Sequence, residues 1–326
     1  MRHNLTARCV VEIPARADRV HPVNRAIAAR STARNSAGIH GENGYHLRMA
    51  TPDPTGARQE ARRSSVPDDG GGAVLRADGS YLSGALGRPQ QYACLMPASA
   101  GPAEQRFPLV VLLHGLAGAW TDWPRFTRIA RYLAGKNIVV VCPDGGSGWY
   151  PNGVGGGGRY EDDILQDLLP AIEKALPVLP YPHRAVGGLS MGGYGAVKIA
   201  LKHPRLFHVA FSHSGALDVA RRPDVHPVFG DPVGDAAFRR AEDPAWLAEQ
   251  ALCAPPVDRP LLFLDCGLDD PLIDANRSFS SHLDYIGYGH TYRELPGHHT
   301  WPYWDRAFRT QLAEVTGAIS RAPRVR

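Results

Sequence analysis

The sequence predicts an α/β fold in which a mostly parallel central sheet carries helices on both faces. Two observations support this prediction. The runs 109–113 and 138–142 are apolar throughout, which is typical of strands that are buried on both faces. Such runs alternate along the chain with longer segments, such as 160–176, whose apolar residues recur at the spacing of a helix. A chain that alternates strands and helices in this way usually forms a parallel sheet.

The individual elements follow from the same patterns. We expect strands at 91–96, 109–113, 138–142, 185–188, 209–212, 261–264 and 291–295. We expect helices at about 123–133, 160–176, 191–202, 276–286 and 304–319. The alternation is interrupted at about 218–259. This stretch either caps a site or is a variable excursion with a short helix near Trp246.

Composition divides the chain into two parts. Residues 1–72 are rich in Arg, Ala, Ser, Asp, Pro and Gly, have few aromatic residues and show no sustained periodicity. Such a segment cannot bury enough apolar surface to offset the entropy lost on ordering. We therefore expect a disordered N-terminal extension at 1–72 and one folded domain at 73–326.

The charge distribution argues against a nucleic-acid partner. Residues 1–72 contain 11 Arg, no Lys and 7 acidic residues, so the formal net charge of +4 lies entirely in that segment. The remainder of the chain is neutral overall. No basic face is therefore expected on the folded domain, and nucleic acid is not an expected partner.

Cysteine usage and hydropathy indicate the cellular compartment in which the protein is expected. Five cysteines, with no C-x-x-C pair and no Cys/His cluster at zinc spacing, argue against a disulfide framework and a structural metal. The first twenty residues lack the apolar core of a signal peptide, and no apolar stretch approaches the ~20 residues of a membrane span. We expect a cytoplasmic protein in a reducing environment, with no metal and no membrane contact.

The strongest chemical motif is Gly-Leu-Ser-Met-Gly at 188–192. It follows an apolar strand-like run and precedes the expected helix 191–202. A serine in this context sits on a sharp strand-to-helix turn, where the flanking glycines relieve steric crowding. The free N–H groups of the following helix then face any developing negative charge. Ser190 is therefore the candidate nucleophile.

A serine nucleophile needs a base, and the base needs a carboxylate that orients it. In folds that carry a serine on this strand-to-helix turn, the acid follows the serine along the chain and the histidine comes last. Asp265, Asp269 and Asp270 all follow the expected strand 261–264. Asp270 is preferred, because a turn just before it would carry its carboxylate back toward the edge of the sheet.

The candidate base follows the next strand. Pro-Gly-His-His-Thr-Trp at 296–301 comes directly after the expected strand 291–295. His299 is the preferred base and His298 is the alternative. The other histidines considered do not fit the chain order and are expected to pack or to lie on the surface: His114, His203 and His213.

When a serine attacks a carbonyl group, the carbonyl oxygen becomes a negatively charged oxyanion, which needs two hydrogen-bond donors. The substrate also needs a pocket. The N–H of Met191, directly after the nucleophile, is one expected donor. The N–H of Leu116 is the other, because it lies in the loop that follows the strand 109–113. Trp149, Tyr150 and Trp301 border these loops. They are candidate walls of the substrate pocket, with core packing as the alternative.

Together these motifs resemble the putative esterase group of the α/β-hydrolase superfamily. This group includes esterase D (S-formylglutathione hydrolase), bacterial tributyrin esterases and the mycolyltransferase antigens. The resemblance covers about 92–308 and is closest to the tributyrin esterase branch. It is carried by His-Gly-Leu at 114–116, Ser-Gly-Trp-Tyr at 147–150, Gly-Leu-Ser-Met-Gly-Gly-Tyr-Gly at 188–195, Phe-Ser at 211–212, Ser-Gly-Ala-Leu at 214–217, Cys-Gly at 266–267 followed by Asp270, and Gly-His-His-Thr-Trp at 297–301.

The resemblance implies an α/β-hydrolase catalytic domain at 73–326, with His299 as the base and Asp270 as the acid. We expect a serine carboxylesterase that hydrolyses small, short-chain esters through an acyl-enzyme and needs no cofactor. An acyltransferase and a thioester or S-acylglutathione hydrolase would use the same three residues. A non-catalytic binding protein on the same scaffold is an alternative of another class. The expected partner is a small-molecule ester, and the oligomeric state is left open.

Overall fold

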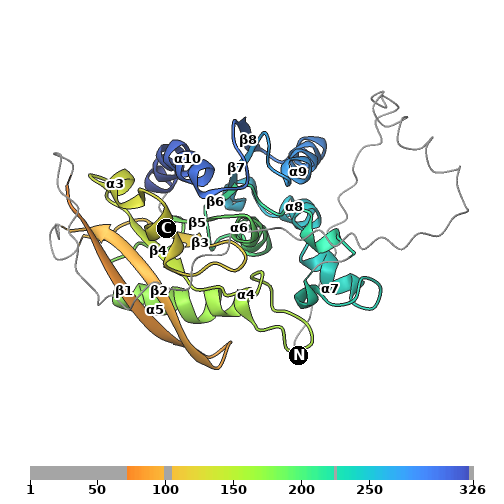
Figure 1. Cartoon of the computed structure of the whole chain (residues 1–326), viewed down its shortest axis with the longest axis horizontal. Coiled ribbons are helices and arrows are strands. Elements are labelled where there is room, and N and C mark those ends of the chain that lie inside the picture. Colours follow the sequence, from red (N-terminus) through yellow and green to blue (C-terminus); the bar gives the residue numbers. More distant parts are fainter. Residues whose placement is uncertain (1–71, 99–104, 224–225, 323–326) are drawn as a thin grey trace, which may run out of the picture. The chain divides into compact units, whose positions relative to one another are not determined.

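A computed structural model of the chain describes residues 72–98, 105–223 and 226–322. The disordered extension expected at 1–72 therefore lies, except for its last residue, outside the described residues. The described strands form a single sheet in the order β1-β2-β4-β3-β5-β6-β7-β8 (Figure 1). Their bounds are β1 Val74–Ser83, β2 Arg88–Pro97, β3 Leu109–Leu113, β4 Val139–Pro143, β5 Arg184–Leu189, β6 Val209–His213, β7 Leu261–Gly267 and β8 His290–Leu295.

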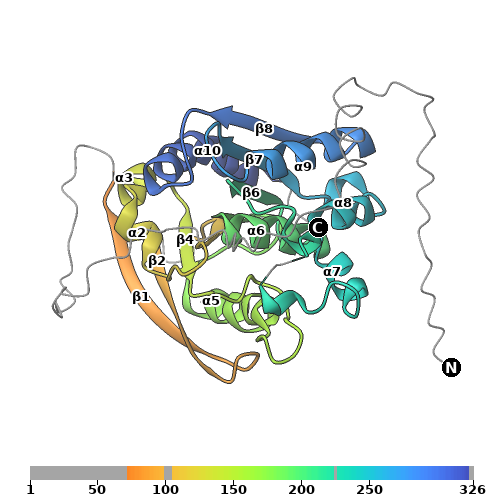
Figure 2. The ribbon, with the colours of Figure 1, turned by 45° about the vertical axis from the view of Figure 1, so that its right-hand side comes forward.

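The sheet is mostly parallel, as the sequence predicts. From β4 through β3, β5, β6 and β7 to β8, each strand pairs in parallel with its neighbour. β1 and β2 are antiparallel to each other, and β2 is antiparallel to β4. This hairpin, orange in Figure 2, forms one edge of the sheet, and β8 forms the other.

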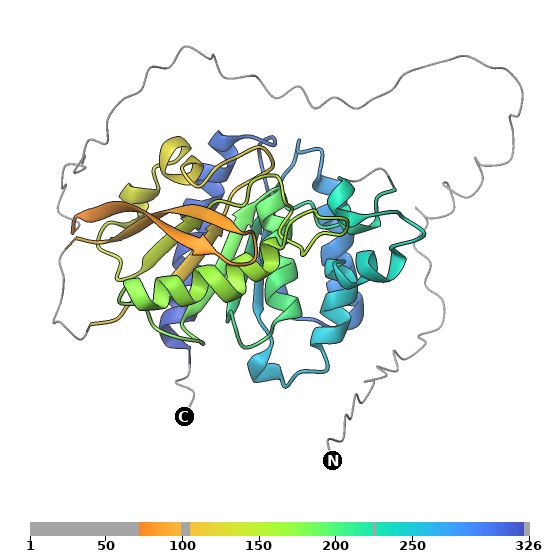
Figure 3. The same cartoon turned by 90° about the horizontal axis from the view of Figure 1, so that it is seen from below.

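Helices cover both faces of the sheet. The helical elements are α2 Asp122–Phe126, α3 Ile129–Leu133, α4 Tyr160–Asp162, the π-helical η2 Asp163–Leu168, α5 Leu169–Ala175, α6 Met191–Lys202, α7 Ala236–Ala241, α8 Pro244–Ala251, α9 Ile273–Ile286 and α10 Trp301–Arg321, with short 3₁₀ turns η3 Val219–Arg221, η4 Pro227–Phe229 and η5 Pro256–Asp258. In Figure 3 the green helices α5 and α6 lie in front of the sheet and the blue α10 lies behind it.

Two apolar cores follow from the alternation of side chains along the strands. Val111 and Val186 face the core that includes η2, α5, α6, α8 and α9. Val110 and Ala185, one position earlier on the same strands, face the opposite core with α2, α3 and α10. Because successive side chains of a strand point to opposite faces, a strand between two helical layers must be apolar throughout. The central strands are accordingly buried at every position.

Several boundaries differ from the prediction for local reasons. The helix expected at 123–133 is two short helices, because Thr127 between them is extended and its hydroxyl accepts a hydrogen bond from the N–H of Ile129 at 3.3 Å. The segment 160–176 is helical, but it has π-helical geometry over η2. β1 was not predicted. It is mostly exposed and pairs with a neighbour on one side only, so it carries little apolar pattern.

The stretch 218–259 has two structural roles. α8 belongs to the helical layer on the sheet, with Ala245, Leu247 and Ala248 in its core. The earlier part of the stretch forms a small separate cluster around Phe229 and the side chain of Tyr194. No helix in the described ranges is long and apolar enough to cross a membrane.

Candidate active site

The carboxyl ends of the parallel strands bring three of the predicted residues together. Ser190 follows β5, Asp270 follows β7 and His299 follows β8. His299 Nε2 lies 3.0 Å from Ser190 Oγ. His299 Nδ1 lies 2.9 Å from Asp270 Oδ2 and 3.1 Å from Asp270 Oδ1. The three side chains therefore form one continuous hydrogen-bonded chain at one edge of the sheet.

Ser190 lies on a sharply strained turn. Its backbone has φ 53° and ψ −117°, and α6 begins at the next residue. Non-glycine residues adopt positive φ only where the surrounding structure enforces it. The turn is so tight that a Cβ built on Gly188 would lie 2.6 Å from the carbonyl oxygen of Gly192. A Cβ on Gly192 would lie 2.5 Å from the carbonyl oxygens of Leu113 and His114. Both glycines are thus required by close backbone packing.

The carboxylate of Asp270 is placed to fix the orientation of His299. It is 2 % exposed, and the N–H of Leu272 donates to its Oδ1 at 2.9 Å. Burial alone would raise the pKa of Asp270, but the hydrogen bond and charge of His299, with the Leu272 N–H, hold that pKa below its usual value. Because a carboxylate only accepts, Nδ1 of His299 must carry the proton. Nε2 then presents a lone pair to the hydroxyl of Ser190.

The loop after β3 approaches Ser190. A Cβ built on Gly115 would lie 3.6 Å from Ser190 Cβ. The side chain of His114 holds this loop, since the N–H of Gly145 donates to its Nε2 at 2.8 Å and its Nδ1 donates to the carbonyl of Gly115 at 2.7 Å. Within the described part of the chain, the N–H of Leu116 makes no backbone hydrogen bond.

Met191 is the first residue of α6, so its N–H has no acceptor within the helix. The two predicted oxyanion donors thus belong to the segments that flank Ser190. Leu116 is exposed.

The alternatives left open by the sequence are separated by burial and by their partners. Asp269 and His298 are exposed. Asp265 is buried, and its carboxylate accepts hydrogen bonds from His213 and Tyr303. Of the three acids, only Asp270 lies against His299.

Two of the three aromatic residues considered for the pocket are half-buried. Trp301 packs against Phe126 with ring centroids 5.0 Å apart, and against Trp304 at 5.3 Å. Trp304 in turn meets the ring of His299 edge-on at 4.9 Å. Trp149 packs against Tyr194 and Phe229.

The third residue, Tyr150, lies in the core. Its side chain is fully buried, and its hydroxyl donates to the carbonyl of His114 at 3.2 Å. Tyr150 therefore supports the loop after β3 from below and does not present its ring at the surface.

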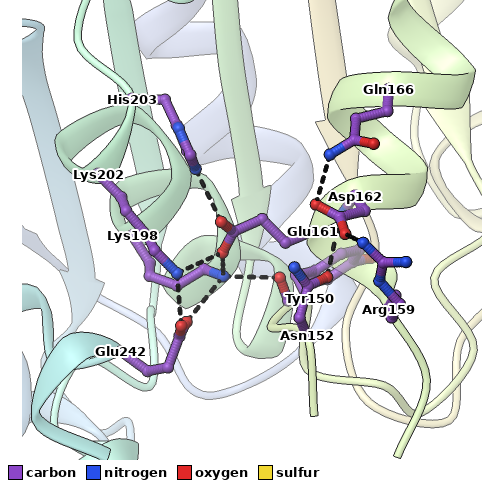
Figure 4. Close-up of polar contacts among 10 residues, drawn as sticks. All are labelled: Tyr150, Asn152, Arg159, Glu161, Asp162, Gln166, Lys198, Lys202, His203 and Glu242. Carbon is purple, nitrogen blue, oxygen red and sulfur yellow. Dashed lines mark hydrogen bonds and ion pairs between the residues drawn. The ribbon is translucent and has the colours of Figure 1, made fainter. Parts of the chain in front are cut away.

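A buried ion network that was not predicted from the sequence lies under the same region (Figure 4). Lys198 of α6 is fully buried and forms ion pairs with Glu161 and with Glu242, the latter at 2.9 Å. Its ammonium also donates to the carbonyl of Tyr150 at 2.7 Å. Lys202 pairs with both glutamates, at 3.0 and 2.6 Å. The network therefore joins α6 to the Trp149–Tyr150 loop and to the end of α7.

The charges of this network are balanced by close contacts. Burial alone would raise the pKa of Glu161, but Lys198, His203 and Lys202 hold it well below its usual value. His203 Nε2 lies 2.7 Å from the second oxygen of Glu161. The only hint in the sequence is one lysine in the middle of the otherwise apolar run 194–201. In the described ranges, no group of three or more His, Cys, Asp or Glu side chains is arranged to hold a metal ion.

Comparison with known proteins places this arrangement in a family. The sequence model of the family described as "Putative esterase" matches residues 83–315. The esterase Rv1288 of Mycobacterium tuberculosis (strain H37Rv) is 30 % identical over 250 residues, covering 68 % of this chain and 55 % of the relative. The chain thus spans about half the length of that relative. An acetyl esterase of Caldicellulosiruptor saccharolyticus is 28 % identical over 221 residues, covering 62 % of this chain and 81 % of the relative.

Solved structures are similar over most of their length. FphF, a fluorophosphonate-binding serine hydrolase of Staphylococcus aureus, has a TM-score of 0.67 and 24 % identity, covering 74 % of this chain and 98 % of that one. The S-formylglutathione hydrolase FrmB of the same organism has a TM-score of 0.67 and 24 % identity, covering 74 % of this chain and 99 % of that one. With the sheet order, these likenesses establish the α/β-hydrolase fold.

Gly192→Ala should destabilise the protein by about 2–3 kcal/mol, because the new Cβ meets rigid backbone at the end of β3. Gly317→Ala is the matched control, since it is also a helical glycine but its Cβ meets only the flexible end of Arg321. Replacing glycine in a helix favours folding by up to about 1 kcal/mol, so the control should be neutral or stabilising. Urea unfolding measures both variants. Equal stability of the Gly192→Ala and Gly317→Ala variants would contradict the close backbone packing at the turn around Ser190.

Glu161→Gln should lower the free energy of unfolding by about 3 kcal/mol at neutral pH, because it leaves the buried Lys198 with one carboxylate fewer. A carboxyl whose pKa is lower when folded than when unfolded stabilises the fold above its unfolded pKa, about 4.3 for glutamate. This contribution is lost as the pH falls below that value, so the difference between wild type and variant should shrink in acid.

Unfolding in urea at pH 7 and below pH 4 measures this difference. Glu314→Gln, which breaks a half-exposed pair with Arg293, is the control and should cost under about 1 kcal/mol. If the two variants lost the same stability at pH 7, the buried network would not have the role described.

Proposed function

The chain belongs to the putative esterase family, and on that basis we propose that it is a serine carboxylesterase that hydrolyses small esters through an acyl-enzyme. The observation that carries the proposal is the hydrogen-bonded chain from Ser190 through His299 to Asp270. These residue types, in this order and at these distances, are what nucleophilic acyl transfer requires.

Ser190 Oγ attacks the ester carbonyl while Nε2 of His299, 3.0 Å away, accepts its proton. The imidazolium that forms is stabilised by the carboxylate of Asp270, which already accepts from Nδ1. His299 then gives its proton to the leaving alcohol, and the acyl group stays on Ser190. A water molecule, deprotonated by the same imidazole, releases the acid and restores the hydroxyl.

The N–H groups of Leu116 and Met191 bind the oxyanion in this proposal. The positive φ of Ser190 turns the start of α6 toward the reacting carbon, where the free N–H groups of the helix favour negative charge. Loss of one such donor typically costs ~3 kcal/mol of transition-state stabilisation. Both donors are backbone groups, so the glycines and the His114 contacts that hold the loops matter more here than the side chains of Leu116 and Met191.

We propose short-chain acyl esters as substrates and no cofactor, since every proton transfer above is assigned to a side chain or to water. The half-buried Trp149 and Trp301 remain candidates for walls of the substrate pocket. The 28 % identity to an acetyl esterase supports a small acyl group. An extension at 1–72 and a single catalytic domain at 73–326 also remain part of this proposal.

Ser190→Ala should reduce kcat for p-nitrophenyl acetate by about 10⁶-fold without loss of fold, because the nucleophile is removed. His299→Ala should be similarly inactive, whereas His298→Ala, which changes an exposed neighbour, should keep near wild-type activity. Steady-state kinetics with a circular dichroism check of the fold, together with labelling of Ser190 by a fluorophosphonate, measures these effects. Comparable turnover by Ser190→Ala, or equal loss in both histidine variants, would contradict the assignment.

We also propose a cytoplasmic location. Cys94 and Cys142 lie buried on neighbouring strands as free thiols, and burial raises the pKa of Cys94 to about 12, so both should be inert. Fractionation of the native cells, followed by thiol titration of the unfolded protein, tests this. Recovery from the medium, or with paired cysteines, would contradict it.

A further inference from the structure

A second buried histidine–aspartate pair lies beneath the proposed site and takes no part in the mechanism above. Nδ1 of His213, at the end of β6, donates to Asp265 Oδ2 at 2.6 Å. The hydroxyl of Tyr303, in the first turn of α10, donates to Asp265 Oδ1 at 2.7 Å. All three side chains are buried. Asp265 therefore joins β6, β7 and α10 through two hydrogen bonds that no solvent can replace.

Tyr303 is the link from this carboxylate to the loop that carries His299. A Cβ built on Gly297 would lie 2.7 Å from the ring of Tyr303, so the backbone of the loop rests directly on the ring. The N–H of Tyr303 also donates to the carbonyl of Thr300 at 3.0 Å. Both ends of the short segment that holds His299 thus contact the one residue whose hydroxyl is fixed by Asp265.

The same loop is joined to the segment that carries Asp270. The carbonyl of Gly297 accepts a hydrogen bond from the N–H of Asp269 at 3.0 Å. A Cβ built on Gly267 would lie 2.4 Å from that carbonyl oxygen, so the two backbones are in contact. A shift of the ring of Tyr303 would therefore change the separation of Asp270 and His299.

His213 holds the other end of the arrangement. Its ring lies among Trp123, Phe211 and Phe308, and its backbone carbonyl accepts the N–H of Ser190 at 3.0 Å. The residue that orients Asp265 is thus also the residue that fixes the nucleophile's backbone. Trp123 donates in turn to the carbonyl of Leu113, where the loop toward Leu116 begins.

We propose that Tyr303, Asp265 and His213 form a positioning network that sets the distance between Ser190, His299 and Asp270. The inference rests on the proposed esterase function. None of the three side chains is placed to touch the substrate, so they are positioning residues and not catalytic ones. Because reaction rates are sensitive to misplacement of a base by about 1 Å, loosening this network should slow the chemical step and spare binding.

The test compares Tyr303→Phe with Tyr288→Phe in the full chain. Both changes remove one buried hydroxyl and keep the ring. Tyr288 donates to the carbonyl of Pro260 at 2.9 Å, at the opposite end of β7 from the proposed site. It therefore controls for stability. The readouts are kcat and KM for p-nitrophenyl acetate, the rate of fluorophosphonate labelling of Ser190, and the thermal unfolding midpoint.

We expect Tyr303→Phe to lower kcat by about tenfold or more and to slow labelling by a similar factor. KM should stay within about twofold of wild type, and the unfolding midpoint should fall no further than in Tyr288→Phe. Asp265→Asn should have a similar effect on kcat. Because both changes act along one path, the double variant should lose little more than the worse single one.

Wild-type kcat in Tyr303→Phe, an equal loss in Tyr288→Phe, a change confined to KM, or multiplying losses in the double variant would each overturn the positioning role. In all these cases the wild type still hydrolyses the ester, so the proposed function stands. A wild type that neither turns over the ester nor reacts with the fluorophosphonate would overturn the proposed function and this inference with it.

Discussion

The site depends on the close approach of the turn after β5 to the end of β3. Gly188 and Gly192 leave no room for a side chain against the backbone at Leu113 and His114. This contact holds Ser190 at a positive φ that a serine would not adopt alone, at a cost of order 1–3 kcal/mol. The surrounding sheet can supply that energy because its central strands are buried on both faces.

The remaining parts of the site are held to that turn by polar contacts from both sides of the sheet. On one side, His213, Asp265 and Tyr303 fix the loops after β7 and β8. On the other, Lys198 and its glutamates hold the loop at Trp149 and Tyr150 against α6. In a low-dielectric interior such contacts hold the chain rigidly, because breaking one leaves a buried polar group without a hydrogen-bond partner, at a high cost in free energy.

Local patterns were sufficient for much of the fold. The bounds of α6 agree with the prediction, because strand, glycine, serine and helix follow one another within a few residues. β1 was missed because an edge strand needs no apolar pattern. The preference for Asp270 rested on the turn expected before it. The preference for His299 rested on its place after the last strand and on the family resemblance. The structure sets the two side chains within hydrogen-bonding distance of each other. Their catalytic roles remain a proposal.

Properties that depend on distant partners were beyond the sequence. Asp265 lies in β7 and Asp270 lies shortly after that strand. They differ because Asp265 meets partners 52 and 38 residues away along the chain. Trp149 and Tyr150 are adjacent, and only tertiary packing decides which ring is buried. The partner of Lys198, Glu161, is 37 residues distant, so an isolated lysine in an apolar helix gave no hint of which acid would meet it.

The buried ion pairs around Lys198 also restrict which substitutions the protein can tolerate during evolution. An apolar residue at position 198 is tolerable only if Glu161 and Glu242 change as well, since otherwise two carboxylates lose their fully buried counter-ion. Each single step toward that exchange passes through a protein with an uncompensated interior charge. These positions should therefore covary as a set in descendants of this sequence, and the neighbouring loop is free to drift only within the geometry that they allow.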